Sequence, residues 1–218
     1  MKNHPVTNPN GRFTYGDLCT WPEDERWELI DGEAVAMVPP PNQRHQEVVG
    51  ELYRQMANFF LGKTCKVLVR PFGVLFPKAG EPDERVATMV EPDVMVICDP
   101  GKLNGKVCRG APDLVVEVLS PSTSSQDCIR KRRVYEAAGV REYWLVDPAN
   151  RVIIVLRNLD GKGFGPAIFL SPEGLAETPL FPGLQIDLGL VFPAEPSVVR
   201  EDPPPAPPRR RRPAKKKG

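Results

Sequence analysis

The sequence predicts an α/β or α+β fold with a central mixed β-sheet, and three observations lead to this prediction. Short apolar runs of strand-like composition recur along the chain, a helical pattern separates two of them in the middle, and a hairpin signal stands near the N-terminus. The chain has 218 residues, of which 41% are hydrophobic, so it can bury one sizeable core. No apolar run approaches the roughly 18 residues that a membrane span needs.

The first predicted element is an N-terminal β-hairpin. Asp31 and Gly32 stand between two strand-like runs, 27–30 and 33–37. An Asp-Gly pair in this position is a strong hairpin signal, because both central residues of the tight turn need a positive φ.

An amphipathic helix follows the break at Pro39, Pro40 and Pro41. Asn42 can cap its N-terminus, and the pattern ends near Gly62. Apolar residues recur along it at three- and four-residue intervals: Val48, Val49, Leu52, Met56, Phe59 and Phe60.

The rest of the pattern alternates strands with one more helix. A strongly basic helix begins after the serine-rich segment 122–125 and ends at Gly139. Two of the strands lie on either side of a turn at 147–150. The predicted strands are 65–69, 72–76, 93–98, 114–119, 142–146 and 152–156.

Charge is divided unevenly between a body and a tail. The 29 lysines and arginines nearly balance the 28 aspartates and glutamates, but seven of the basic residues and no acidic one lie in 203–218. The rest has 22 basic against 28 acidic residues, which excludes a uniformly basic domain that coats nucleic acid. We expect residues 1–192 to form one domain and the proline-rich segment 193–218 to be a disordered tail. The tail either solubilises the chain or attracts DNA electrostatically.

The five cysteines are odd in number, contain no CxxC pair, and indicate neither a zinc ribbon nor a disulfide framework. Residues 1–10 lack the charged start and apolar stretch of a secretory signal. We therefore expect a reducing, cytoplasmic compartment.

Two carboxylates interrupt apolar strands and are the main candidates for chemistry: Asp93 in EPDVMVIC and Glu117 in DLVVEVLS. A buried ionised carboxylate must be paired or bind a metal, since leaving it bare costs several kcal/mol. If the two strands are neighbours, the carboxylates can meet and supply the oxygen ligands that Mg²⁺ prefers. The alternative is structural: Asp93 only begins a strand, and Glu117 pairs with a core arginine or lysine.

Lys131 is the third candidate, on the helix that follows the strand of Glu117. From there its ammonium could orient an attacking water or neutralise charge on a phosphate. The alternative is that Lys131 belongs to a solvated basic helix face, because residues 130–133 are all basic.

Five successive segments resemble the bacterial Uma-type family, whose members are described as restriction endonucleases and assigned to the PD-(D/E)XK phosphodiesterase superfamily. The resemblance runs in order from about Phe13 to Leu188, and the stretch 110–148 is its most specific part. It implies a restriction-endonuclease-like core, a central mixed sheet flanked by helices, with a Mg²⁺ site at the carboxylate-bearing strands. The segments are WELIDGE, PPNQRHQ, EPDVMVI, GAPDLVVEVLSPST and KRRVYEAAGVREYWLVDP.

The resemblance also assigns roles to residues. Asp93 and Glu117 match the two acidic motif positions and would be the metal ligands. The usual lysine two positions after the second acid is replaced by Leu119, and Lys131 on the next helix is the residue that fits its role.

Glu33 and His45 stand where the family also tends to keep polar residues. Glu33 would add a metal ligand or position a lysine, and His45 would contact phosphate or assist proton transfer. The alternatives are a carboxylate beside a turn and a histidine at a helix start.

The predicted function is therefore a Mg²⁺-dependent endonuclease that cuts DNA, with Mn²⁺ as a substitute cofactor and a homodimer as the expected assembly. The rival prediction is a nucleic-acid-binding or regulatory protein that keeps the nuclease scaffold without efficient cleavage, which the missing lysine of the usual motif favours. A purely structural protein would leave both strand carboxylates unexplained.

Overall fold

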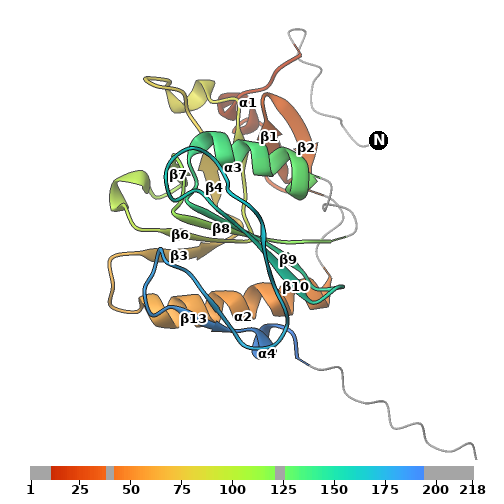
Figure 1. Ribbon diagram of the computed structural model, residues 1–218. Helices are drawn as coiled ribbons and strands as arrows, with labels where there is room; N and C mark the ends of the chain where they lie inside the picture. The colour runs from red at the N-terminus through yellow and green to blue at the C-terminus, as the bar shows by residue number, and fades with distance from the viewer. Residues whose placement is uncertain (1–10, 38–41, 121–125, 194–218) are drawn as a thin grey trace, which may run out of the picture.

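The computed structural model describes residues 11–37, 42–120 and 126–193, and its main body is a six-stranded sheet between two helical layers (Figure 1). The strand order in this sheet is β11-β10-β9-β8-β6-β3. The pair β8–β9 is parallel and the other pairs are antiparallel, so the sheet is mixed, as predicted. The strands are β3 (Lys66–Val69), β6 (Val94–Ile97), β8 (Leu114–Val118), β9 (Glu142–Asp147), β10 (Val152–Arg157) and β11 (Ile168–Leu170).

Both faces of the central strands are buried, which explains why the sequence of β6 and β8 reads as nearly continuous apolar runs. On one face, Val94 and Val116 pack with helix α2 (Gln43–Phe60), which lies along the lower side in Figure 1. On the other face, Val115 packs with helix α3 (Arg132–Ala138), above the sheet in the same view. Met95, on that same upper face, packs against the second sheet.

The second sheet has five strands in the order β2-β1-β5-β4-β7. The predicted hairpin forms two of them, and Asp31 and Gly32 at its turn have φ values of +51° and +81°. The strand predicted at 72–76 is the third of them, β4, so the predicted strands divide between two sheets. The sequence analysis does not predict β5 and β7, because strands of two and three residues are too short for a period-two pattern. The strands are β1 (Trp27–Ile30), β2 (Glu33–Ala36), β4 (Gly73–Leu75), β5 (Met89–Val90) and β7 (Val107–Arg109).

The start of helix α2 and the end of helix α3 lie where the sequence predicts them. The side chain of Asn42 caps α2 by accepting the backbone N–H of His45 at 2.9 Å. The basic segment begins as a π-helical turn, Gln126–Lys131, and continues as α3, which ends at Gly139 with a φ of +82°. The predicted serine cap, 122–125, lies outside the described residues. Smaller elements are α1 (Tyr15–Leu18), α4 (Leu188–Val191), β12 (Leu175–Glu177) and β13 (Gln185–Asp187).

One disulfide corrects the expectation drawn from cysteine spacing. The β3–β6 register places Lys66 opposite Ile97, and one step further Cys65 stands opposite Cys98, to which it is bonded. A sequence separation of 33 residues gave no hint that the two cysteines face each other across neighbouring strands.

Two other expectations concern the C-terminal segment and membrane-spanning helices. The predicted tail, 193–218, lies outside the described residues except for Pro193. Among the described residues, no helix combines the length and the apolar composition that crossing a bilayer requires.

Candidate active site

Three charged residues lie side by side on neighbouring strands of the six-stranded sheet. They stand at one end of these strands, which we call this edge of the sheet. Val94 lies opposite Val116 in the β6–β8 pair, so the next position places Asp93 opposite Glu117. The same step in the β3–β6 pair places Arg70 opposite Asp93. Directly opposite residues of antiparallel strands project from the same face, so the three side chains share the side of the sheet that α3 covers.

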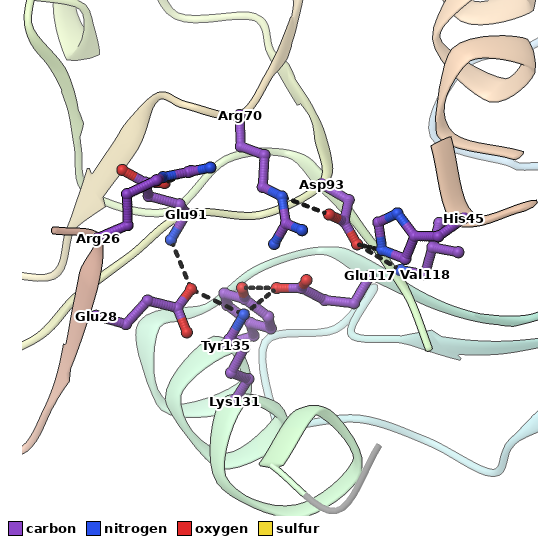
Figure 2. Close-up of polar contacts among 10 residues, drawn as sticks. All are labelled: Arg26, Glu28, His45, Arg70, Glu91, Asp93, Glu117, Val118, Lys131 and Tyr135. Atoms are coloured by element: carbon purple, nitrogen blue, oxygen red, sulfur yellow. Dashed lines mark hydrogen bonds and ion pairs between the residues drawn. The ribbon is translucent and has the colours of Figure 1, made fainter. Parts of the chain in front are cut away.

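Asp93 is buried among positively charged or polar partners (Figure 2). Its Oδ2 accepts the backbone N–H of Val118 at 2.8 Å and lies 3.2 Å from Nε2 of His45. Its Oδ1 lies 3.0 Å from Nε of Arg70, an ion pair that lacks the geometry of a hydrogen bond. Burial by itself would raise the pKa of Asp93, but His45, Arg70 and the Val118 N–H together lower it below its usual value, so the carboxylate is ionised.

Two buried polar atoms in this group have no hydrogen-bond partner among the described residues: Oδ1 of Asp93 and Nδ1 of His45. Buried polar atoms are normally hydrogen-bonded, and an exception calls for an explanation such as a bound ion or water. Within the described residues, the hydrogen-bond network around Asp93 is therefore incomplete, which a purely structural role does not explain.

Glu117 and Lys131 form the other half of the site. Nζ of Lys131 donates to Oε1 of Glu117 at 3.0 Å and lies 2.8 Å from Oε1 of Glu28 on β1. All three side chains are buried. Glu28 also accepts the backbone N–H of Glu91 at 2.9 Å. The lysine thus joins a carboxylate of each sheet (Figure 2).

Tyr135 completes this half. It lies four residues after Lys131, on the same face of the helical segment, and its hydroxyl donates to Oε1 of Glu117 at 2.6 Å. Burial, followed by the neighbouring charge of Glu117, raises the pKa of Tyr135 well above its usual value. The hydroxyl therefore stays protonated and acts as a fixed donor to the carboxylate.

The structure brings together four of the five residues that the sequence singled out: Asp93, Glu117, Lys131 and His45. Glu33 does not join them. Its side chain is 68% exposed on the outer strand of the hairpin, where it pairs with Arg130.

Sequence reasoning missed Glu28, Arg70 and Tyr135. Glu28 carried the same signal as Glu117, a carboxylate within an apolar strand, since it stands beside Leu29 and Ile30. Arg70 carried no signal, because its place beside Asp93 depends on the pairing of β3 with β6.

The donor set suits a hard divalent cation. The described residues contain no group of three or more histidine, cysteine, aspartate or glutamate side chains close enough to share a metal ion. Two carboxylates alone would leave most of the coordination of such an ion to waters, as is usual for Mg²⁺. The buried Oδ1 of Asp93, which has no hydrogen bond, is an oxygen donor of the required kind.

Comparisons with known proteins agree with this fold. Residues 14–189 match the sequence model of the Uma2 family, described as "Putative restriction endonuclease". The chain is 26% identical over 170 residues to "Uncharacterized protein slr1290" from Synechocystis sp., a match that covers 75% of this chain and 83% of that protein. The crystal structure of "a putative nuclease belonging to DUF820" from Anabaena variabilis superposes with a TM-score of 0.64 at 19% identity, over 83% of this chain and 99% of that one. At this identity the superposition establishes the fold.

Proposed function

Because the chain belongs to the Uma2 family, we propose that it is a metal-dependent endonuclease that hydrolyses DNA phosphodiester bonds at the edge formed by Asp93 and Glu117. The observation that carries the proposal is the cross-strand pair of buried carboxylates with Lys131 bonded to one of them. Two carboxylates and a lysine are groups that a nuclease can use to bind a metal ion and orient a water. Buried charges add little net stability to a core, so stability alone does not explain them.

Asp93 and Glu117 are the residues that would hold Mg²⁺, or Mn²⁺ in its place. When bound, the ion would stabilise the negative charge that develops on the phosphoryl oxygens. His45 and the Val118 N–H keep Asp93 ionised and oriented for this task.

Lys131 is the residue that would orient the attacking water. Glu117 and Glu28 fix the position of its ammonium beside the row of charged residues, where a positive charge attracts the oxygen of a water. The water adds to phosphorus, the phosphorus–oxygen bond to one sugar breaks, and the products are a phosphomonoester and a free hydroxyl. Tyr135 holds Glu117 in place from the opposite side.

The test is cleavage of supercoiled plasmid by the wild type, Asp93→Asn and Glu117→Gln, with Mg²⁺ binding measured by calorimetry on the same preparations. We expect Mg²⁺-dependent nicking by the wild type and a loss of both nicking and metal binding in each variant. Arg54→Gln is the matched control, since Arg54 is exposed on α2 and pairs only with Glu51 on its own helix within the described chain. Unchanged cleavage by either carboxylate variant would contradict the proposal.

A second candidate function is DNA binding without turnover, and Leu119 at the position of the usual motif lysine favours it. Wild-type protein that binds DNA but does not nick it in Mg²⁺ or Mn²⁺ would support this candidate. Loss of binding on deletion of residues 203–218 would then assign the affinity to the basic segment.

DNA is thus the proposed partner, and we also propose a homodimer, because two copies related by a two-fold axis match the two antiparallel strands of a duplex. Analytical ultracentrifugation tests the assembly directly. A monomer at micromolar concentration, with and without duplex DNA, would contradict it.

A further inference from the structure

We propose that Arg70 is the residue that binds the phosphate of the substrate. Asp93 holds one side of its guanidinium, and the outer nitrogens, Nη1 and Nη2, take the phosphate oxygens. This inference rests on the proposed function and adds to it a substrate-binding residue that neither the motif nor the family resemblance indicates.

The position of Arg70 is the first argument. It follows β3 directly, stands opposite Asp93 in the strand register, and so extends the row of Asp93 and Glu117 by one strand. The three side chains come from the same face and the same edge of the sheet. A phosphodiester presented to the two carboxylates would therefore lie beside Arg70.

The second argument is the state of the guanidinium. A guanidinium has five N–H donors in a planar fork. Within the described chain, the ion pair between Nε of Arg70 and Asp93 is the one polar contact of this side chain. Figure 2 shows the two outer nitrogens extending from that contact toward the side of the site where Glu117 and Tyr135 lie. The Arg70 side chain is 18% exposed, so it is partly desolvated but not sealed from solvent.

Other arginines of the molecule make the contrast clear. Arg157 uses Nε for Glu142 and Nη2 for the carbonyl of Glu177. Arg109 similarly uses Nε for Asp83 and Nη2 for the carbonyl of Glu81. In both, Nε and an outer nitrogen are engaged by fixed groups, as a structural role requires, whereas Arg70 offers its outer nitrogens to a ligand.

Electrostatics gives the third argument. Three carboxylates, Asp93, Glu117 and Glu28, lie around the site, and together they repel a phosphate anion. Lys131 is engaged by two of them. A bidentate arginine–phosphate pair is among the strongest charge-assisted hydrogen bonds, and a lysine does not reproduce its planar geometry. Arg70 is placed to overcome the repulsion at the point where the phosphate must bind.

The alternative is that Arg70 only neutralises Asp93. The two roles differ in what they predict for DNA binding. A counter-ion affects stability and leaves the affinity of the folded protein for DNA unchanged, whereas a phosphate ligand changes both the affinity and its dependence on salt.

The experiment measures binding of a labelled DNA duplex by fluorescence anisotropy at several salt concentrations, in EDTA so that no metal-dependent cleavage occurs. We expect Arg70→Gln to bind about tenfold more weakly than the wild type and to lower the slope of log affinity against log salt by about 1. Arg70→Lys should keep the salt slope but lose affinity, because it retains the charge without the fork. Arg54→Gln is the matched control and should bind as the wild type does.

Wild-type affinity and salt slope in folded Arg70→Gln would overturn the inference. If Arg70→Gln does not fold, Arg70→Lys decides: wild-type affinity in that variant would equally overturn it. Nicking in Mg²⁺ separates the two proposals. A wild type that neither binds nor cuts DNA refutes the proposed function, whereas a wild type that does both, together with an Arg70→Gln that binds equally well, refutes this inference alone.

Discussion

Glu117 and Glu142 are two buried glutamates that lie on adjacent parallel strands at opposite ends of the same sheet. Glu117 is near the carboxyl end of β8 and Glu142 at the amino end of β9, where it stands beside Leu114. Their side chains are equally inaccessible to solvent. Burial alone therefore does not distinguish them.

Their partners do distinguish them. Glu142 accepts Nε1 of Trp144 at 2.6 Å on one oxygen, and the hydroxyl of Thr178 at 2.6 Å and Nε of Arg157 at 3.1 Å on the other. Both oxygens are thus satisfied by fixed donors, and the network is closed.

The group around Glu117 is different, because it contains a lysine shared by two carboxylates. Its neighbours Asp93 and His45 each keep a buried atom that has no hydrogen-bond partner within the described chain. The comparison teaches that an incompletely satisfied buried charge, rather than a buried charge as such, marks the site.

Replacing Lys131 by Met should have the largest effect, because it removes the cation that Glu28 and Glu117 share. We expect cleavage to fall on the order of 10³-fold or more, and the free energy of unfolding to fall by about 3–5 kcal/mol, as for breaking a buried ion pair. Plasmid nicking and urea denaturation measure the two effects. Lys162→Met, at a lysine that is 85% exposed, is the control, and a Lys131→Met protein as active as that control would contradict the assignment.

Glu142→Gln should destabilise the protein without abolishing its activity. The amide keeps the shape but leaves Arg157 without its charged partner, and its NH2 group faces either Trp144 or Thr178, each of which donates to a carboxylate oxygen in the wild type. We expect a loss of about 2 kcal/mol in the free energy of unfolding, measured by urea denaturation. Below the unfolding transition, nicking should stay within about threefold of the wild type, because the network is remote from the row of charges. Abolished nicking in folded Glu142→Gln would contradict the view that Glu142 is structural and that Glu117 belongs to the active site.

Tyr135→Phe sharpens the comparison within the site. It removes the hydrogen bond to Oε1 of Glu117 and keeps the ring packed against Tyr143. We expect a stability change of about 1 kcal/mol and a tenfold fall, roughly, in kcat with little change in KM, because the hydroxyl positions a carboxylate rather than binding substrate. A change confined to KM would instead make Tyr135 a substrate-binding residue.

Glu33→Gln should have the smallest effect. The pair of Glu33 with Arg130 is exposed, and exposed pairs contribute about 0–1 kcal/mol. Nicking rates and unfolding midpoints should match the wild type. A large loss of activity would mean that Glu33 approaches the site when DNA is bound.

The sequence was sufficient to predict the mixed sheet, the hairpin, the capped first helix and the pair of strand carboxylates, because each has a local pattern. It singled out Glu117, in the middle of an apolar strand, but gave no account of Glu142, the first residue of β9. Their difference lies in partners that come from distant segments, such as Thr178 and Lys131. Arg70 was invisible for the same reason, because only the register of β3 against β6 brings it to Asp93.

The most direct test of the central claim measures Mg²⁺ binding by calorimetry and plasmid nicking for Asp93→Asn and Glu142→Gln side by side. The difference between the two buried networks predicts that Asp93→Asn loses both metal binding and nicking, whereas folded Glu142→Gln retains both. Metal binding and nicking retained by Asp93→Asn, or lost equally in both folded variants, would contradict the assignment of the active site to this edge of the sheet.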